Sequence, residues 1–323
     1  MNKIFNLFSC CIPVKGYRRS IIIDTQRNES YYIPNDLYNI IKNNPTILTF
    51  NNDKVISDYL DFLLKNELGF LFIKSENFPA IELKWESASL ITNAILEFQN
   101  FNNYNIKKTT DELSELGCKN ILIKIYKNHG INTINRLFLN FKNKGFKSID
   151  ILISHHSLAI EEVSNFIHSN PIIRSFILAD SKKDELIQVS NDGMSSIVLV
   201  QKNINELKKI DSSIFNLNLN LKYISESVNF NNHLNKKVSI DKEGCLKNMP
   251  SFKENFGHID KTKIKDVISN KEFNKLWLIT KDKVNICKDC EHRYICPQLI
   301  TDKEYIKSKP KICNYNPYLA KWQ

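Results

Sequence analysis

Glycine is scarce in this sequence, with 8 glycines among 323 residues. The chain contains no G-x-x-x-x-G-K-[ST] loop, no G-x-G-x-x-G turn and no G-x-S-x-G elbow. Loops that hold nucleotide phosphates need glycine so that backbone N–H groups can approach the phosphate oxygens. The sequence therefore argues against a nucleotide-binding loop in this chain.

Long apolar runs are also missing. No window holds 18 consecutive apolar residues, which a transmembrane helix would need. The N-terminal apolar run is interrupted by Asn6 and Ser9, Pro13 follows it, and no small-x-small cleavage site comes after. This pattern is not that of a secretion signal. We therefore expect a cytoplasmic protein with no membrane partner.

Arginine-rich runs and basic tails are absent, although the formal net charge is +10. Lysines spread over solvated faces account for such a charge, and we find no basic helix with stacking aromatic residues. The sequence thus predicts no nucleic-acid partner. A mildly basic surface does suit an acidic peptide.

The first part of the chain has the pattern of a small winged-helix unit. Residues 17–24 and 30–33 alternate as two strands of a hairpin, and Pro34 stands where a helix can begin. A second, short helix is predicted near residues 52–54, a third from about Ile56, and a further strand at 70–74. We predict a recognition domain over residues 1–78.

Strands and helices then alternate, which is typical of parallel βα units in an α/β fold. We expect strands at 81–85, 88–98, 119–126, 148–154, 173–180 and 195–200, with helices at 131–145 and 157–170. Eight βα repeats do not fit this length, so we predict a partial βα barrel over residues 79–222. His155, His156 and Asp180 end predicted strands, and we interpret them as polar strand ends.

The third predicted domain covers residues 223–323. It should open with a hairpin around Glu243 and Gly244, followed by a helix near 261–278. The tail beyond has little apolar content, so a bound metal would explain how it stays ordered.

Four cysteines crowd into that tail. Cys287, Cys290, Cys296 and Cys313 follow the spacing C-x2-C-x5-C-x16-C. In a cytoplasmic protein such clustering indicates a metal before it indicates disulfides. Four thiolates can hold one zinc ion or one [4Fe–4S] cluster, and the residues leave both possible. The other cysteines lie apart, and we expect Cys10 and Cys11 to be unstructured.

The segment CKDCEHRYIC (287–296) resembles the core of a SPASM domain, the C-terminal extension of many radical-SAM enzymes that modify peptides. The family binds two auxiliary [4Fe–4S] clusters. The four tail cysteines match the ligands of the second cluster. The family's next cysteine falls on Ile300, and no cysteine follows Gly257 where the first site would need one. The resemblance implies one cluster kept and one lost. His292 lies between the cysteines, and because four thiols are available we expect it to be a neighbouring donor or solvated rather than a ligand.

The radical-SAM hallmark C-x3-C-x2-C occurs nowhere in the chain, so S-adenosylmethionine is not an expected cofactor. The layout as a whole resembles the SPASM-domain peptide maturases of grasp-with-spasm systems. That resemblance implies two partners: the leader of a ribosomal precursor peptide and an ATP-grasp ligase. The leader would add as a strand beside the hairpin 17–33 and the helix 56–67.

Two other functions stay open from the residues alone. One is a peptide-binding scaffold stapled by zinc, without redox chemistry. The other is a radical-SAM enzyme whose cluster uses non-standard ligands. The sequence does not decide whether the chain itself catalyses a reaction.

Overall fold

The computed structural model describes residues 3–50, 53–73, 81–154, 158–190, 192–208, 217–298 and 313–322. The chain forms two compact units. The first contains Met1–Trp85, Asp211–Asn232 and Leu278–Gln323, and the second contains Glu86–Ile210 and His233–Trp277. His155, His156 and Ile300 lie outside the described residues. No described helix is both long and apolar enough to span a bilayer.

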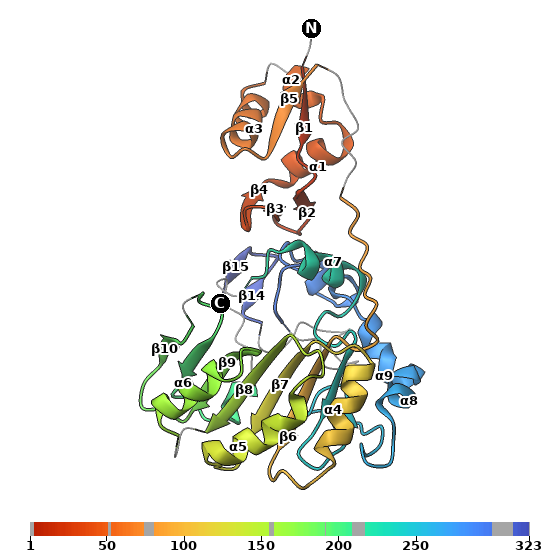
Figure 1. The fold of residues 1–323 in the computed structure, drawn as a ribbon. Helices are drawn as coiled ribbons and strands as arrows, with labels where there is room; N and C mark the ends of the chain where they lie inside the picture. Colours follow the sequence, from red (N-terminus) through yellow and green to blue (C-terminus); the bar gives the residue numbers. More distant parts are fainter. Residues whose placement is uncertain are drawn as a thin grey trace. The chain divides into compact units, whose positions relative to one another are not determined.

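The second unit is built on one large sheet with the strand order β10-β11-β9-β8-β7-β6-β12-β13 in its described part (Figure 1). From β12 through β6, β7, β8 and β9 to β11, every neighbouring pair is parallel, whereas β10 and β13 pair antiparallel at the two ends. The strands are β6 (Asn93–Phe98), β7 (Asn120–Ile125), β8 (Ser148–Ser154), β9 (Ile173–Ala179), β10 (Glu185–Gln188), β11 (Ser196–Leu199), β12 (Lys237–Ile240) and β13 (Leu246–Lys247). The expected α/β unit with a mostly parallel sheet is confirmed.

Alternation along the strands explains how the sheet buries its core. In β7, Ile121, Ile123 and Ile125 are buried while the residues between them are half-buried. This alternation is expected of a strand in a sheet that has one face covered by helices. Helices α4, α5 and α6 lie on one face of the sheet (Figure 1). Aromatic rings join the layers, because Phe166 lies 5.3 Å from Phe138 and 6.1 Å from Phe176, measured between ring centroids.

The helices of this unit are short. They are α4 (Ile106–Glu115), α5 (Ile131–Phe138), α6 (Ile160–His168), α8 (Ile264–Ser269) and α9 (Lys271–Asn274), with single 3-10 turns at Leu139–Phe141, Glu206–Lys208 and Lys275–Leu278. Pro171 stands just beyond the end of α6, as the sequence pattern indicated.

Strand β12 belongs to this sheet rather than to the tail. It forms the predicted hairpin with β13, but it also pairs in parallel with β6 from Lys237 opposite Asn93 to Ile240 opposite Leu96. Residues 233–277 are therefore part of the sheet unit, and the tail from Leu278 is part of the other unit. The predicted domain 223–323 is therefore divided between the two units.

The first unit is centred on a three-stranded antiparallel sheet of β2 (Cys11–Val14), β3 (Ser20–Asp24) and β4 (Glu29–Ile33). The predicted hairpin is confirmed, since β3 and β4 pair from Ser20 opposite Ile33 to Asp24 opposite Glu29. The other N-terminal elements are β1 (Ile4–Leu7), paired with β5 (Gly69–Phe72), and helices α1 (Asn35–Asn43), α2 (Ile47–Phe50) and α3 (Lys54–Lys65).

Two expectations for this unit were wrong. Residues 81–85 form no strand. Strands β1 and β2 occupy the N-terminal segment that the sequence left unassigned, and Cys11 begins β2, so the Cys10–Cys11 pair is ordered. Short strands of four residues carry too little alternation to identify them without their partners.

Every residue of β3 is buried, because both faces of its sheet are covered. On one face, Ile22 packs in a cluster with Leu37 of α1 and Leu63 of α3. On the other face, Ile23 packs with Ile224 and with Ile295. Ile224 lies on α7 (Leu221–Asn229) and Ile295 on the tail, whose described elements are short 3-10 turns at Lys281–Lys283 and Cys287–Asp289, and strands β14 (Tyr315–Asn316) and β15 (Lys321–Trp322).

We predict that substitutions at two adjacent residues of β3 will weaken the packing on opposite faces of its sheet. Ile22→Ala and Ile23→Ala each remove a fully buried side chain and should each destabilise the protein by about 2–5 kcal/mol. Hydrogen exchange should rise in residues 54–65 for Ile22→Ala, and in residues 221–229 and 287–296 for Ile23→Ala. Equal increases in all three segments for both variants would contradict the two-faced packing.

Candidate metal centre

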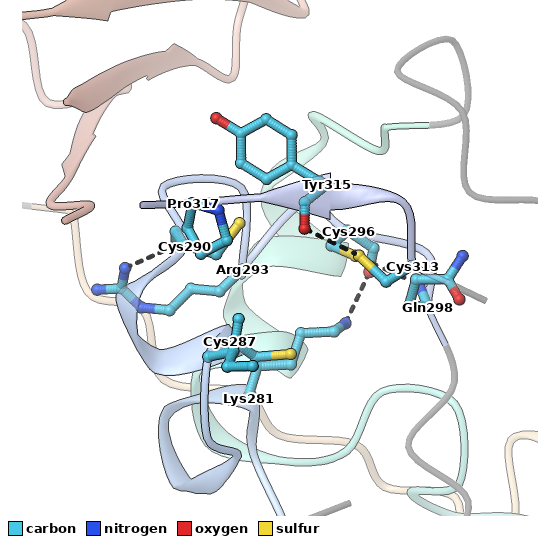
Figure 2. Close-up of a pocket in the computed structure, with 10 residues that line it drawn as sticks. Lys281, Cys287, Cys290, Arg293, Cys296, Gln298, Cys313, Tyr315 and Pro317 are labelled. Atoms are coloured by element: carbon cyan, nitrogen blue, oxygen red, sulfur yellow. Dashed lines mark hydrogen bonds between the residues drawn. The ribbon is translucent and has the colours of Figure 1, made fainter. Parts of the chain in front are cut away.

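The four cysteines of the tail lie around one pocket (Figure 2). Cys287 begins a 3-10 turn, Cys290 ends it, Cys296 follows the next loop, and Cys313 lies two residues before strand β14. None of the eight cysteines, all within the described residues, forms a disulfide. The remaining lining comes from Lys281, Ile286, Arg293, Gln298, Tyr315 and Pro317. Four thiols that face one pocket can act together as metal ligands.

A tight and strained turn presents the first two cysteines. The N–H of Cys290 donates to the carbonyl of Cys287 at 3.0 Å, and the N–H of Lys288 donates to Val284 at 3.0 Å. Ile286, immediately before Cys287, has φ of +70°. A β-branched residue avoids this region, and such strain persists where the surrounding structure holds it, often at functional sites.

Positive charge surrounds the thiols. Lys281 is 4% exposed, and its ammonium donates to the carbonyl of Cys296 at 2.7 Å. Arg293 also lines the pocket, donates to the carbonyl of Cys290 at 3.0 Å and pairs with Asp282 at 2.8 Å. These cations would offset the negative charge of thiolates.

Hydrogen bonds also reach the sulfur atoms. The N–H of Gln298 donates to Cys296 Sγ at 3.5 Å. Burial, followed by the charges of Cys296 and Glu291, raises the pKa of Cys290 well above its usual value. The Cys290 thiol therefore keeps its proton at neutral pH until a metal displaces it, so metal binding should release protons.

The segment between the cysteines is anchored to the N-terminal sheet by a buried ion pair. Arg19 Nε lies 2.8 Å from Glu291 Oε1, and the Glu291 side chain is fully buried. The hydroxyl of Tyr315, a 2% exposed residue, donates to the same carboxylate oxygen, and Arg19 donates to that hydroxyl at 3.3 Å. Residues far apart in sequence thus meet in one polar contact beside Cys290.

Gly16 permits this close approach. A Cβ at this position would lie 2.4 Å from the Arg19 carbonyl oxygen and 2.9 Å from Glu291 Cβ. A backbone hydrogen bond next to it supports the same contact, because the Tyr17 N–H donates to the carbonyl of Asp289 at 2.8 Å. A side chain at position 16 would push the loop before β3 away from the tail.

Helix α7 supports the same segment. The Tyr223 hydroxyl donates to the carbonyl of Cys296 at 2.9 Å, and the N–H of Asn218 donates to Ile295 at 2.9 Å. The cysteine-bearing loop is therefore held by two distant parts of the chain, the N-terminal sheet and residues 217–229.

His292 is held beside the pocket rather than directed to solvent. It is 2% exposed, its Nε2 lies 2.9 Å from the Tyr32 hydroxyl, and its Nδ1 lies 3.9 Å from Cys290 Sγ. Burial lowers the pKa of His292 to about 4, so the imidazole is neutral at physiological pH. The sequence placed this residue near the cysteines but gave no sign of its contact with Tyr32.

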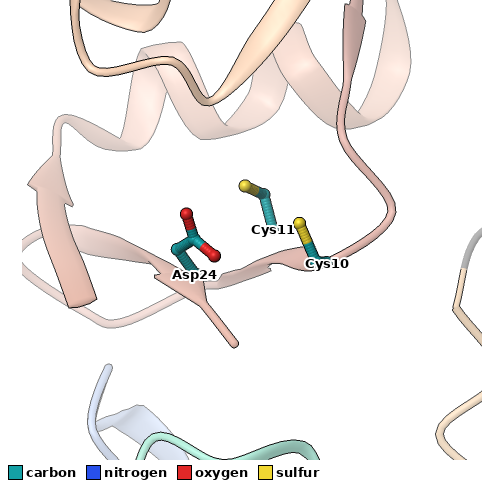
Figure 3. A group of neighbouring side chains, drawn as sticks. All are labelled: Cys10, Cys11 and Asp24. Carbon is teal, nitrogen blue, oxygen red and sulfur yellow. The ribbon is translucent and has the colours of Figure 1, made fainter. Parts of the chain in front are cut away.

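A second group of possible donors lies in the N-terminal sheet, where Cys10, Cys11 and Asp24 come together (Figure 3). Asp24 accepts hydrogen bonds from the N–H groups of Gln26 and Arg27 and from the Arg27 guanidinium. Burial, with smaller effects of Cys10 and Asp24, raises the pKa of Cys11 to about 12. Both carboxylate oxygens of Asp24 are thus already engaged by hydrogen bonds within the sheet.

Polar residues at the carboxyl ends of the parallel strands bond to one another. Ser154 donates to Asp180 at 2.6 Å, and Tyr126 donates to Glu97 at 2.6 Å. Asp180 has φ of +59°, a conformation that Asp adopts in turns. The interpretation of Asp180 as a polar strand end agrees with this geometry.

Comparisons with known proteins give only distant likenesses. No family model and no curated protein matches the chain. The crystal structure of Streptococcus suis SuiB bound to S-adenosylmethionine is similar over 96% of this chain and 99% of SuiB, with 10% identity and a TM-score of 0.43. SuiB bound to the precursor peptide SuiA gives the same coverage and identity with a TM-score of 0.34.

The Arg19–Glu291 pair generates a prediction about stability. Arg19→Met leaves a buried carboxylate without its cation and should destabilise the protein by about 3–5 kcal/mol. The double variant Arg19→Met/Glu291→Gln should recover most of that loss. Urea unfolding measures both. Lys183→Met, which breaks an exposed pair with Glu185, is the control and should change stability by less than about 0.5 kcal/mol. A double variant as unstable as Arg19→Met would refute the prediction.

Proposed function

We propose that this protein is an accessory protein of ribosomal-peptide maturation that carries one [4Fe–4S] cluster and presents a precursor leader to an ATP-grasp ligase. The observation that carries the proposal is the convergence of Cys287, Cys290, Cys296 and Cys313 on one pocket. The chain would hold the cluster in its tail and bind the leader on its N-terminal sheet. Both sites belong to the same compact unit.

The sequence spacing of the cysteines favours a cluster over zinc. Zinc ribbons usually pair one C-x2-C with a second C-x2-C, and this chain has a single C-x2-C, followed by the x5 and x16 spacings. A [4Fe–4S] cluster binds each of four thiolates through a different iron, so the four cysteines that line the pocket can all be ligands.

The charges of the pocket support the same proposal. Four thiolates around a cluster carry a net negative charge, which Lys281 and Arg293 would offset. When bound, the cluster would supply one-electron chemistry. The residues of the chain would hold the ligands, donate hydrogen bonds to sulfur and limit the access of water.

The leader would add to the sheet at β4. This strand forms one edge of the sheet, and its Tyr31 ring meets Phe62 of α3 at 6.3 Å between centroids. The opposite edge, β2, contains Pro13, which has no N–H to donate to an added strand. Strand addition beside a helix is a common way of binding extended peptides, so β4 is the suitable edge.

The proposed ligase partner rests on the resemblance to grasp-with-spasm maturases. Its sequence has none of the glycine-rich loops that cradle nucleotide phosphates. Bond formation driven by ATP would therefore need a second protein, which the resemblance to grasp-with-spasm maturases implies is an ATP-grasp ligase.

The metal content tests the cluster. Protein purified without oxygen should contain about four irons and four sulfides per chain. Cys290→Ser should lose most of this iron, whereas Cys10→Ser, which alters the other thiol group, should keep it. One zinc per chain without sulfide would instead support the zinc-stapled scaffold and refute the cluster.

Hydrogen exchange tests the leader site in the intact protein. The probe is a synthetic leader peptide from a grasp-with-spasm precursor, the partner that the resemblance implies. It should slow exchange in residues 29–33 because their outward N–H groups become bonded, and leave residues 11–14 unchanged. Protection of β2 but not β4, or of neither strand, would refute the proposed edge. Deleting residues 1–78 is a poorer test, since it also removes Arg19 and the core beneath Ile295.

A further inference from the structure

Tyr32, on the edge strand β4, is connected through His292 to Cys290, one of the proposed cluster ligands. The Tyr32 hydroxyl lies 2.9 Å from His292 Nε2, and His292 Nδ1 lies 3.9 Å from Cys290 Sγ. These three residues come from β4 and from the loop that holds the cysteines. The contact therefore joins the proposed leader edge to the proposed metal centre.

Packing fixes the histidine ring in this position. Its centroid lies 4.7 Å from that of Tyr315, 5.6 Å from that of Tyr32 and 6.0 Å from that of Trp322. The Tyr32 ring is fixed in turn, because the Arg19 guanidinium carbon lies 3.5 Å from its centroid. Neither ring can turn away without breaking several contacts.

The chemistry of the sulfur sets the direction of both hydrogen bonds. A metal-bound cysteine is a thiolate and can only accept a hydrogen bond. Nδ1 of the imidazole must then carry the proton and donate to Cys290. In a neutral imidazole Nε2 is left as the acceptor, so the Tyr32 hydroxyl must donate to it.

We infer that His292 is a positioning residue that donates a hydrogen bond to the Cys290 thiolate, and that Tyr32 on the edge strand orients it and thereby influences the reduction potential of the cluster. This inference rests on the proposed function, since it needs a cluster at the four cysteines. Hydrogen bonds to ligating sulfurs stabilise the more negative, reduced state and so raise the potential.

The decisive experiment compares two adjacent tyrosines. Tyr32→Phe removes only the hydroxyl that orients His292. Tyr31→Phe is the matched control, because Tyr31 donates to Glu29 and lies against Phe62 on the helix-covered face. Each protein is titrated anaerobically with dithionite, which gives the cluster one electron and makes or breaks no covalent bond in the protein. Electron paramagnetic resonance follows the reduced cluster.

Tyr32→Phe should keep the wild-type iron content and have a more negative potential than both wild type and Tyr31→Phe. A tenfold change in the ratio of reduced to oxidised cluster corresponds to 59 mV for one electron. Equal potentials in all three proteins at equal iron content would overturn the inference while the cluster stands. Wild-type protein that holds zinc and no iron would overturn the proposed cluster itself, and the inference with it.

The leader peptide gives a second, independent readout. A strand added to β4 would contact the Tyr32 side chain, so binding should shift the wild-type potential. By linkage, the leader must then bind the reduced and oxidised proteins with different affinities, tenfold for each 59 mV. Tyr32→Phe should bind the leader but lose this shift. A shift of the same size in Tyr32→Phe would show that Tyr32 does not transmit it.

Discussion

The buried contact between Arg19 and Glu291 determines where the cysteine-bearing loop can lie. Glu291 has no exposed side-chain surface, and its carboxylate meets one guanidinium and one tyrosine hydroxyl. Burying two charges costs desolvation free energy, and their mutual attraction offsets this only when both partners stay in place. Because Cys290 and His292 flank Glu291, this pair fixes the positions of both residues that the proposed centre depends on.

Apolar packing on the same face adds to this polar contact. The tail is poor in apolar residues, so it has no separate core, and Ile295 packs against Ile21 and Ile23 of the N-terminal sheet. The continuous run of isoleucines in β3 follows from this arrangement, since a strand covered on both faces has no exposed side. The tail and the N-terminal sheet therefore form one folding unit, in which a bound metal would add stability to contacts that already exist.

Long local patterns predicted the elements that the structure contains: the strand 148–154 and the hairpin of β3 and β4 both follow from alternation. The four closely spaced cysteines line one pocket, and their role as metal ligands stays a prediction. The pairing of β12 with β6 was not predicted, because KVSI carries no sign of its partner strand. The Arg19–Glu291 and Tyr32–His292 contacts join residues more than 250 positions apart, and no local pattern encodes such a meeting.

The distribution of polar groups separates the roles of the two units. At the strand ends of the large sheet, Ser154 bonds Asp180 and Tyr126 bonds Glu97, so these pairs satisfy one another. Around the cysteine pocket two polar groups instead point at sulfur: the N–H of Gln298 at Cys296, and the imidazole of His292 at Cys290. Hydrogen bonds from these donors become stronger when the thiols lose their protons and become thiolates. The proposed metal centre thus lies in the tail, which the small N-terminal sheet supports.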